Sequence, residues 1–438
     1  MNVVEKVRED TIEQLLAGTY VDPDTGKTVG VTTKFMEIAP SLAGMESELI
    51  EQLGFGRTVA VVSDKNTHEV MGARIERAIG GRHQVVSVVL PDGVHPDGET
   101  VEKVRAETAG ADALIAVGSG TINDLSKYAS AQDKKPYAVF GTAPSMNGYT
   151  SVNAAITMHG HKMSLPAHAP VGAFFDLAIL SAAPTRLIRA GLGDSLCRTT
   201  SQADWLLAHL LFGKPYRKLP YALLKNDEGP LFAQSAALVR GDRQTMERLV
   251  RTLNLSGFGT AIVGNSEPAS QGEHLISHYI DMFADPSRPL IYHGEQIAVT
   301  TLSMARLQHK MLDGKPVVKP DTQTEADFIA RYGAEIGKSC WSEFSKKRLD
   351  ADKAEAVNAR ISDNWNDIVE KVSAVLLPTE HLHAVMSATG ADLTPEKIHL
   401  SRSFYEKALL RCREIRNRYT FLDLASDTGA IASLTSSL

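Results

Sequence analysis

Three segments in the second half of the chain carry side chains that can bind a metal ion. They are GLGDSLC with Asp194, GEHLISHYID with His274 and His278, and LIYHGEQIAV with His293. His274 and His278 are four residues apart, so they share one face of a predicted helix. The spacing is not that of an HExxH site, because Glu273 precedes His274 and cannot be the general base of that motif. Histidines on helices also serve as buried hydrogen-bonding residues, and both interpretations stay open on the residues alone.

A glycine turn follows the apolar run ADALIAV. The run breaks at Gly118, Ser119 and Gly120, and TINDLSKYA then continues with a helical pattern. A strand that feeds a helix through glycines directs unpaired backbone N–H groups at one point, where the helix dipole adds positive potential. The turn therefore predicts a site for an anion such as phosphate. It is not a complete dinucleotide fingerprint, because Asn123 stands where a third glycine is expected.

An acidic residue, Asp64, ends the earlier hydrophobic run TVAVVSD. An acidic side chain at a strand end can accept hydrogen bonds from the ribose of a dinucleotide, but in the usual fingerprint it follows the glycines. Here the order is inverted. Without a ligand, Asp64 would be an ordinary turn residue that closes a strand.

Several polar residues near the glycine turn have both a structural and a functional interpretation. Thr121 and Asp124 belong to TIND, a capping-box pattern that would stabilise the helix start without any ligand. Asp124 and Lys127 are three residues apart and could pair on a solvated helix face. Thr142 and Ser145 lie in TAPS, which could be an ordinary polar turn.

A histidine-rich stretch lies further along the chain. Lys162 follows HGH and could neutralise a substrate phosphate, although most lysines are surface residues. His159, His161 and His168 form a loose cluster, which we predict to lie in loops without a metal.

Apolar runs alternate with helical patterns up to Pro184. The strand-like runs are TVAVVSD, VVSVVL, ADALIAV, KPYAVFGTA and VGAFFDLAIL, and beyond Pro184 apolar residues repeat at helical spacing. Such alternation predicts parallel βαβ units of an α/β fold. We therefore predict a Rossmann-like parallel-sheet domain over residues 1–184, an all-helical domain over residues 185–438, and a ligand cleft between them.

Composition excludes several classes of protein. The 438 residues are 43% hydrophobic, and 46 basic against 52 acidic residues give a net charge of -6 without a basic stripe, which argues against nucleic-acid binding. Cys197, Cys340 and Cys412 are too scattered for a disulfide framework or a CxxC metal site. The N-terminal MNVVEKVREDTIEQLL is charged and amphipathic, unlike a signal peptide, and no run is long enough to span a membrane. We expect a cytoplasmic protein.

The motifs together resemble one superfamily. The glycine turn, TAPSMNGYTS, GDSLCRTTSQADW, GEHLISHY and YHGEQIA resemble the iron-containing alcohol dehydrogenase and dehydroquinate synthase superfamily. Within it they most resemble the bacterial type of sn-glycerol-1-phosphate dehydrogenase. The order of segments matches over residues 58–298, and IRNRYTFLDLA near the C-terminus is also similar.

The resemblance implies a metal site. Asp194, His274 and His293 would bind one divalent ion, which could be zinc, nickel or iron, and leave a position open for a substrate oxygen. His278 would face the same pocket as a proton-relay residue or form a structural hydrogen bond.

The resemblance also implies an NAD(H) site. The segment with Gly118, Ser119, Gly120 and Thr121 would bind the pyrophosphate, and Asp64 would bind the adenine ribose. Such an aspartate repels a 2′-phosphate, which favours NAD over NADP. Thr142 and Ser145 would line the nicotinamide end.

The implied substrate contacts are Asp124, Lys162 and Asn147, where Asn147 replaces the aspartate that is typical of the family. The implied activity is the reversible reduction of dihydroxyacetone phosphate to sn-glycerol 1-phosphate in a homo-oligomer of two or more chains. Alternatives are a metal-dependent dehydrogenase of another polyol or phosphorylated alcohol, a dehydroquinate synthase, which fits the segments less well, or a non-catalytic ligand-binding relative.

Overall fold

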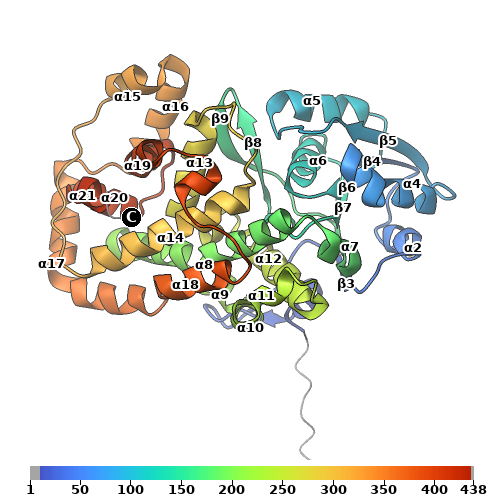
Figure 1. The fold of residues 1–438 in the computed structure, drawn as a ribbon, viewed down its shortest axis with the longest axis horizontal. Helices are drawn as coiled ribbons and strands as arrows, with labels where there is room; N and C mark the ends of the chain where they lie inside the picture. Colours follow the sequence, from blue (N-terminus) through green and yellow to red (C-terminus); the bar gives the residue numbers. More distant parts are fainter. Residues whose placement is uncertain (1–9, 436–438) are drawn as a thin grey trace, which may run out of the picture.

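The computed structural model describes residues 10–435, and a six-stranded sheet organises the first part of them. Neighbouring strands are parallel throughout, in the order β3-β10-β7-β6-β4-β5. The sheet lies at one side of the molecule and most helices of the second half lie at the other (Figure 1). This confirms the predicted α/β architecture followed by helices. The strands are β3 (Phe35–Ala39), β4 (Thr58–Asp64), β5 (Gln84–Leu90), β6 (Ala113–Gly118), β7 (Tyr137–Gly141) and β10 (Gly172–Asp176).

Four of the predicted strands lie within or close to their apolar runs. The fifth run, VGAFFDLAIL, is a strand only up to Asp176. The Asp176 carboxylate accepts the N–H groups of Ala178 and Ile179 at 3.0 and 3.2 Å, so it ends the strand and starts helix α7 (Leu177–Ala182). The edge strand β3 was not predicted, because FMEIA is short and has a glutamate in its middle.

An antiparallel hairpin follows the sheet strand β7. Its strands are β8 (Asn153–Met158) and β9 (His161–Pro166). The predicted loop position is therefore wrong for His161, which begins β9, whereas His159 lies in the tight turn with a φ of 51° and His168 follows the hairpin. The hairpin was missed because its two six-residue strands are short and mix polar with apolar residues, without a continuous apolar run.

Helices cover both faces of the parallel sheet, because successive strand residues point to opposite faces and both sets are apolar. Val61 belongs to the apolar cluster with α2 and α4, and its neighbour Val62 belongs to the cluster with α5 and α6. The elements of this part other than the sheet are α1 (Thr11–Ala17), β1 (Tyr20–Val21), β2 (Thr28–Val29), α2 (Glu46–Glu51), α3 (Lys65–Thr67), a π-helical turn (His68–Gly72), α4 (Ala73–Ile79), α5 (Gly98–Glu107) and α6 (Gly120–Gln132).

Beyond α7 the described chain, up to residue 435, contains helices and no strand. The amphipathic α17 is typical, since its buried residues Val357, Ile361 and Trp365 recur every four positions. The helices are α8 (Thr185–Phe212), α9 (Leu219–Ala222), α10 (Glu228–Ala233), α11 (Ser235–Leu238), α12 (Arg243–Val263), α13 (Gly272–Phe283), α14 (His293–Leu312), α15 (Glu325–Tyr332), α16 (Ala334–Phe344), α17 (Ala351–Ser373), α18 (Thr379–Ser387), α19 (Arg402–Arg411), α20 (Phe421–Asp427) and α21 (Ile431–Thr435), with 3₁₀ turns η2 (Glu267–Ala269), η3 (Pro395–Ile398) and η4 (Cys412–Ile415).

A division into domains at residues 184 and 185 coincides with the start of α8 but stays a prediction, because one apolar cluster contains residues from both sides of it. None of the helices in residues 10–435 combines the length and the apolar character needed to cross a membrane. Residues 1–9, where the amphipathic N-terminal segment begins, lie outside the described part.

Candidate active site

The three predicted metal ligands lie close together, although they belong to three different helices. Asp194 lies in α8, His274 in the first turn of α13, and His293 begins α14. One ligand atom from each lies within 4.8 Å of the other two, and the His274 and His293 rings are 5.0 Å apart between centroids. Asp194 and His274 are buried, and His293 is half-buried. The helices thus place one carboxylate and two imidazoles around a common point.

The donor atoms of this group fit a cation. Asp194 Oδ1 is buried and has no hydrogen-bond partner within residues 10–435, whereas Oδ2 accepts the Asn147 N–H at 2.6 Å. His274 Nδ1 bonds to Glu273 Oε1 at 2.9 Å, so its Nε2, 3.8 Å from Asp194 Oδ1, carries the free lone pair. A buried unpaired carboxylate oxygen is costly unless it binds a cation. The group therefore has the composition and the unmet charge of a divalent metal site.

Charge states in this group also suit metal binding. Burial raises the pKa of Asp194 to about 6, against the opposing effects of His274 and the Asn147 N–H. Burial, helped by the charges of His274 and Lys162, holds the pKa of His293 well below its ordinary value. His293 is therefore neutral near pH 7, which is the form that binds a metal.

Glu273 orients His274, a role the sequence did not reveal. Burial alone would raise the pKa of Glu273, but the hydrogen bond from His274 and the Gln271 N–H outweigh it and lower the pKa. Glu273 Oε2 also accepts the Thr200 hydroxyl at 3.0 Å. A carboxylate that fixes the ring of a ligating histidine is a common outer partner of metal sites. We did not predict it, because adjacent helix residues rarely face each other.

Glu273→Gln is expected to weaken zinc binding about 10- to 100-fold, because the amide loses the charge that fixes His274 Nδ1. Calorimetric titration of zinc into the metal-stripped variant measures this. The matched control is Glu380→Gln, which changes an exposed carboxylate of α18 and should bind zinc as the wild type does. Equal zinc affinity in the Glu273 variant would contradict the orienting role.

A second set of possible ligands, Cys197, Glu273 and His274, overlaps the first. Burial, together with the Asp194 and Glu273 charges, raises the pKa of the Cys197 thiol well above its ordinary value. The thiol donates to the Asp194 backbone oxygen at 3.0 Å. A protonated, hydrogen-bonded thiol is a poor ligand, so the set with Asp194 is better suited to bind an ion.

His278 stands one helical turn from His274 and beside both histidine ligands. Its ring centroid is 6.0 Å from that of His274 and 6.1 Å from that of His293. Its Nδ1 is 3.5 Å from Arg416 Nη2. Burial and the Arg416 charge hold the pKa of His278 well below its ordinary value, so the ring is neutral. The proton-relay role remains a prediction.

Glycines allow the helices of the site to approach closely. A Cβ atom on Gly191 would overlap the Pro144 carbonyl, and one on Gly193 would overlap the Gly294 carbonyl. Gly294 in turn lies against the Ala190 carbonyl. Backbone contact between α8, α14 and the loop after β7 therefore brings Asp194 and His293, which are 99 positions apart in sequence, to one point.

The glycine turn lies at the carboxyl edge of the parallel sheet, beside the end of β4. The chain goes from β4 to β5 on one side and then to β6 on the other, so this edge is a switch point, where nucleotides bind in open α/β sheets. A side chain on Gly118 would collide with Ile122, and the Thr142 N–H donates to the Gly118 oxygen at 3.1 Å. The capping box predicted at Thr121 is wrong, because the helix starts after Ser119, which gives no side-chain cap.

Asp64 ends β4 and caps the short helix α3. Its Oδ1 accepts the Thr67 N–H at 2.8 Å, and the Thr67 hydroxyl accepts the Asp64 N–H at 3.0 Å. The structural role considered for Asp64 is thus present, and its binding of a ribose remains a prediction. Thr142 and Ser145 are buried in the turn after β7, on the same edge of the sheet.

The predicted solvated pair of Asp124 and Lys127 is wrong, because both side chains are buried in α6. Lys127 Nζ donates to the Gly148 oxygen, to Ser151 Oγ and to the Asn153 oxygen. Burial lowers the pKa of Lys127 to about 8. These bonds fix the segment that links the turn after β7 to the hairpin, so Lys127 has a structural role.

Asp124 and Lys162 lie near the metal-ligand group but not within it. Asp124 Oδ2 accepts the Ala155 N–H at 3.1 Å, and burial raises its pKa against the nearby charges of Lys127 and Lys162. Lys162, in β9, also acts on the pKa of His278 and His293. Its ammonium group therefore faces the same region as the metal-ligand group. Asn147 contacts Asp194 through its backbone N–H and not through its side-chain amide.

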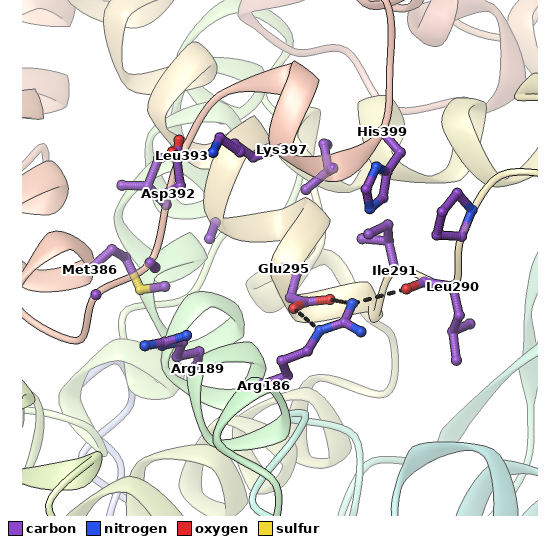
Figure 2. Close-up of a pocket in the computed structure, with 15 residues that line it drawn as sticks. Arg186, Arg189, Leu290, Ile291, Glu295, Met386, Asp392, Leu393, Lys397 and His399 are labelled. Carbon is purple, nitrogen blue, oxygen red and sulfur yellow. Dashed lines mark hydrogen bonds and ion pairs between the residues drawn. The ribbon is translucent and has the colours of Figure 1, made fainter.

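A separate cavity of about 330 Å³ lies between the starts of α8 and α14 and the loop before η3 (Figure 2). Arg186 crosses it and binds Glu295 through two nitrogens, each at 2.8 Å, and the Leu290 oxygen at 2.9 Å. None of the predicted site residues lines this cavity. We do not assign it to the candidate active site.

The comparisons with known proteins agree with the geometry. Residues 37–184 match the protein family described as iron-containing alcohol dehydrogenase. Over 62% of this chain and 76% of the relative, the sequence is 32% identical to a glycerol-1-phosphate dehydrogenase [NAD(P)+] of Thermococcus kodakarensis. A protein of the same description from Geobacillus thermodenitrificans is 26% identical over 84% of this chain and 86% of its own length.

Solved structures share the fold. A probable glycerol dehydrogenase from Sinorhizobium meliloti has a TM-score of 0.59 at 15% identity and covers 92% of this chain and 97% of its own. A sulfoacetaldehyde reductase from Bifidobacterium kashiwanohense, solved with NAD+, has a TM-score of 0.61 at 14% identity. The match covers 93% of this chain and 97% of the reductase. At such identities the likeness extends to the fold alone.

Proposed function

Because the chain belongs to the iron-containing alcohol dehydrogenase family, and within it to the glycerol-1-phosphate dehydrogenases, we propose that it reduces dihydroxyacetone phosphate reversibly to sn-glycerol 1-phosphate. As a member it is a nicotinamide-dependent oxidoreductase. The observation that carries the substrate proposal is the convergence of Asp194, His274 and His293 on one point beside the cationic Lys162. An enzyme that reduces this ketone must polarise its carbonyl group and bind its phosphate group.

We propose that Asp194, His274 and His293 hold one divalent ion, with Glu273 fixing the first histidine. When bound, such an ion supplies Lewis-acid polarisation of a carbonyl oxygen. Zinc, nickel and iron all accept this donor set. The same buried residues limit the water around the reacting carbon, which strengthens electrostatic interactions there.

We propose that NAD(H) binds at the carboxyl edge of the sheet, where it supplies the hydride. The turn of Gly118, Ser119, Gly120 and Thr121 offers backbone N–H groups to its pyrophosphate, since no side chain caps that end of α6. Asp64 favours NAD over NADP, because a carboxylate repels the 2′-phosphate. Thr142 and Ser145 would lie at the nicotinamide end.

His278 is the proposed proton-relay residue in the reducing direction. When its Nδ1 accepts from Arg416, the ring hydrogen is on Nε2 and can hydrogen-bond to the substrate oxygen. A bound water would return a proton to the ring as the ring passes one on, so that the ring stays neutral. Asp124, whose raised pKa makes it a weaker acid than usual, lies near Lys162 and is proposed to contact a substrate hydroxyl together with the Asn147 amide.

The test is NADH oxidation by metal-stripped protein after zinc, nickel or iron(II) is added back in parallel. We expect oxidation with dihydroxyacetone phosphate, little with unphosphorylated dihydroxyacetone, and weaker use of NADPH. Equal rates with both ketones would favour a dehydrogenase of another polyol. Absence of turnover with any of the three metals, in protein that still binds NAD, would favour a non-catalytic relative.

A further inference from the structure

The C-terminal segment after η4 brings an arginine into the candidate active site. Arg416 is extended, and its Nη2 donates to the Lys162 backbone oxygen at 2.8 Å and lies 3.5 Å from His278 Nδ1. Lys162 precedes it by 254 positions. The two residues thus come from distant segments, and the charges of both act on His278 beside the metal-ligand group.

Neither of these two cations forms a direct ion pair. Among residues 10–435, neither Arg416 nor Lys162 forms an ion pair with a carboxylate within 4.0 Å. Burial and the charge of Arg418 lower the pKa of Arg416 to about 10, although Glu343 and Cys340 act in the opposite direction. Both side chains are half-buried, and the Asp124 carboxylate acts on Lys162 from a distance. A partly buried cation without a direct ion pair favours an anion bound beside it.

A neighbouring arginine, Arg413 in η4, forms ion pairs with carboxylates. Arg413, three positions earlier, lies 2.6 Å from Asp321, 2.9 Å from Asp427 and 3.3 Å from Asp423. Those carboxylates raise its pKa. Arg418, two positions after Arg416, has no carboxylate partner either, but its guanidinium is bonded to the Ser270 oxygen and to Ser266 Oγ.

Arg416 is held in place from both sides. On one side, the Arg413 ion pairs fix η4. On the other, Arg418 donates to the Ser270 oxygen and, at 2.7 Å, to Ser266 Oγ. Both contacts fasten the segment to the loop before α13, which carries His274. The guanidinium is therefore pre-organised beside His278, at little cost in side-chain entropy on binding.

We propose that Arg416 and Lys162 together form the subsite that binds the substrate's phosphate beside His278. This inference rests on the proposed function, because it assigns the phosphate of that substrate to two residues. Since Nη2 of Arg416 already faces the Lys162 oxygen and His278, its Nε and Nη1 would donate charge-assisted hydrogen bonds to phosphate oxygens, and the Lys162 ammonium adds a compact charge. The phosphate would lie on the side of His278 away from the His274 ligand and would direct the carbonyl end toward the metal-ligand group.

Inorganic phosphate is the probe that tests the subsite without turnover. Its affinity is measured by the rise in thermal midpoint over a phosphate series, with chloride added to constant ionic strength. We expect Arg416→Gln to weaken phosphate binding about 10- to 100-fold, as the loss of charge-assisted hydrogen bonds implies. Arg416→Lys, which keeps the charge, should lose less, and it replaces the glutamine variant if that one fails to fold.

Arg243→Gln is the control for the loss of one arginine charge, because Arg243 is exposed at the start of α12, outside the candidate active site. We expect its phosphate affinity to stay within about threefold of the wild type, since an exposed, distant charge is screened by solvent and salt. Equal losses in the Arg416 and Arg243 variants would overturn direct binding by Arg416. Unchanged affinity in Arg416→Gln, or no phosphate effect in the wild type, would also overturn the proposal.

Kinetics separate this proposal from the proposed function. We expect Arg416→Gln to raise KM for dihydroxyacetone phosphate much more than KM for dihydroxyacetone, because only the first ketone uses the subsite. Arg416-dependent phosphate binding in a wild type that cannot reduce dihydroxyacetone phosphate would refute the activity and leave the subsite standing. Wild-type reduction with unchanged KM in the variant would refute the subsite alone.

Discussion

Asp194→Asn is expected to lower the reduction of dihydroxyacetone phosphate about a thousandfold and to leave the purified protein nearly free of metal. Asparagine has almost the same shape, and its carbonyl can still accept the Asn147 N–H that Asp194 Oδ2 accepts at 2.6 Å. It lacks the negative charge of the buried, unpaired Oδ1. The variant therefore isolates the charge from the fold. Elemental analysis and kcat measured with excess zinc check the two parts of the expectation.

The control for this change is Asp313→Asn, which alters an exposed carboxylate at the end of α14 and should keep full activity. The thermal midpoint of the metal-stripped Asp194 variant should equal or exceed that of the metal-stripped wild type. The reason is that a buried carboxylate without a cation is unfavourable. Full turnover and metal content in Asp194→Asn would refute the assigned ligand set.

Gly191→Ala is expected to lower the free energy of unfolding by about 3 kcal/mol and to reduce activity with it. The added Cβ would overlap the Pro144 carbonyl, and neither group can yield without moving backbone. Pro144 lies in the loop that carries Asn147 to Asp194, so any shift would also disturb the metal-ligand group. Urea denaturation followed by circular dichroism measures the loss.

Gly229→Ala is the matched control, because it is also a helical glycine but has no heavy atom within 4 Å of the added Cβ. There the change should alter stability by no more than about 1 kcal/mol, because the helix propensity of alanine is opposed by the restriction that Pro230 places on the residue before it. Wild-type stability in Gly191→Ala would show that α8 and the loop after β7 separate without cost. The close approach would then not be needed to place the ligands.

Periodicity predicted the α/β part well, because buried parallel strands such as β4 and β6 are continuous apolar runs. It failed where the pattern was weak. Strand β3 has only five residues, and the hairpin strands β8 and β9 are short and mix polar with apolar residues. The helical second half was predicted as a class, although spacing alone could not indicate which of its helices touch.

The three proposed ligands were named through a resemblance, and spacing alone had left His274 and His278 open to a structural role. The geometry adds the reason for the choice, since His274 faces the unpaired Asp194 Oδ1. Burial was the hardest property to predict. A solvated face was one of the interpretations left open for Lys127, which is buried, and Arg416 was not singled out, because a charged residue in a short irregular segment gives no periodic signal.

The hydrogen bond from the Asn147 N–H to Asp194 has a thermodynamic consequence. The residue before it, Met146, packs against Gly120 of the proposed pyrophosphate turn, so one short loop contacts both proposed sites. If either ligand orders this loop, the other gains affinity, and linkage requires the two gains to be equal. Metal loading would then set the concentration of NAD at which half the protein is bound, and NAD would set the retention of metal by the same factor.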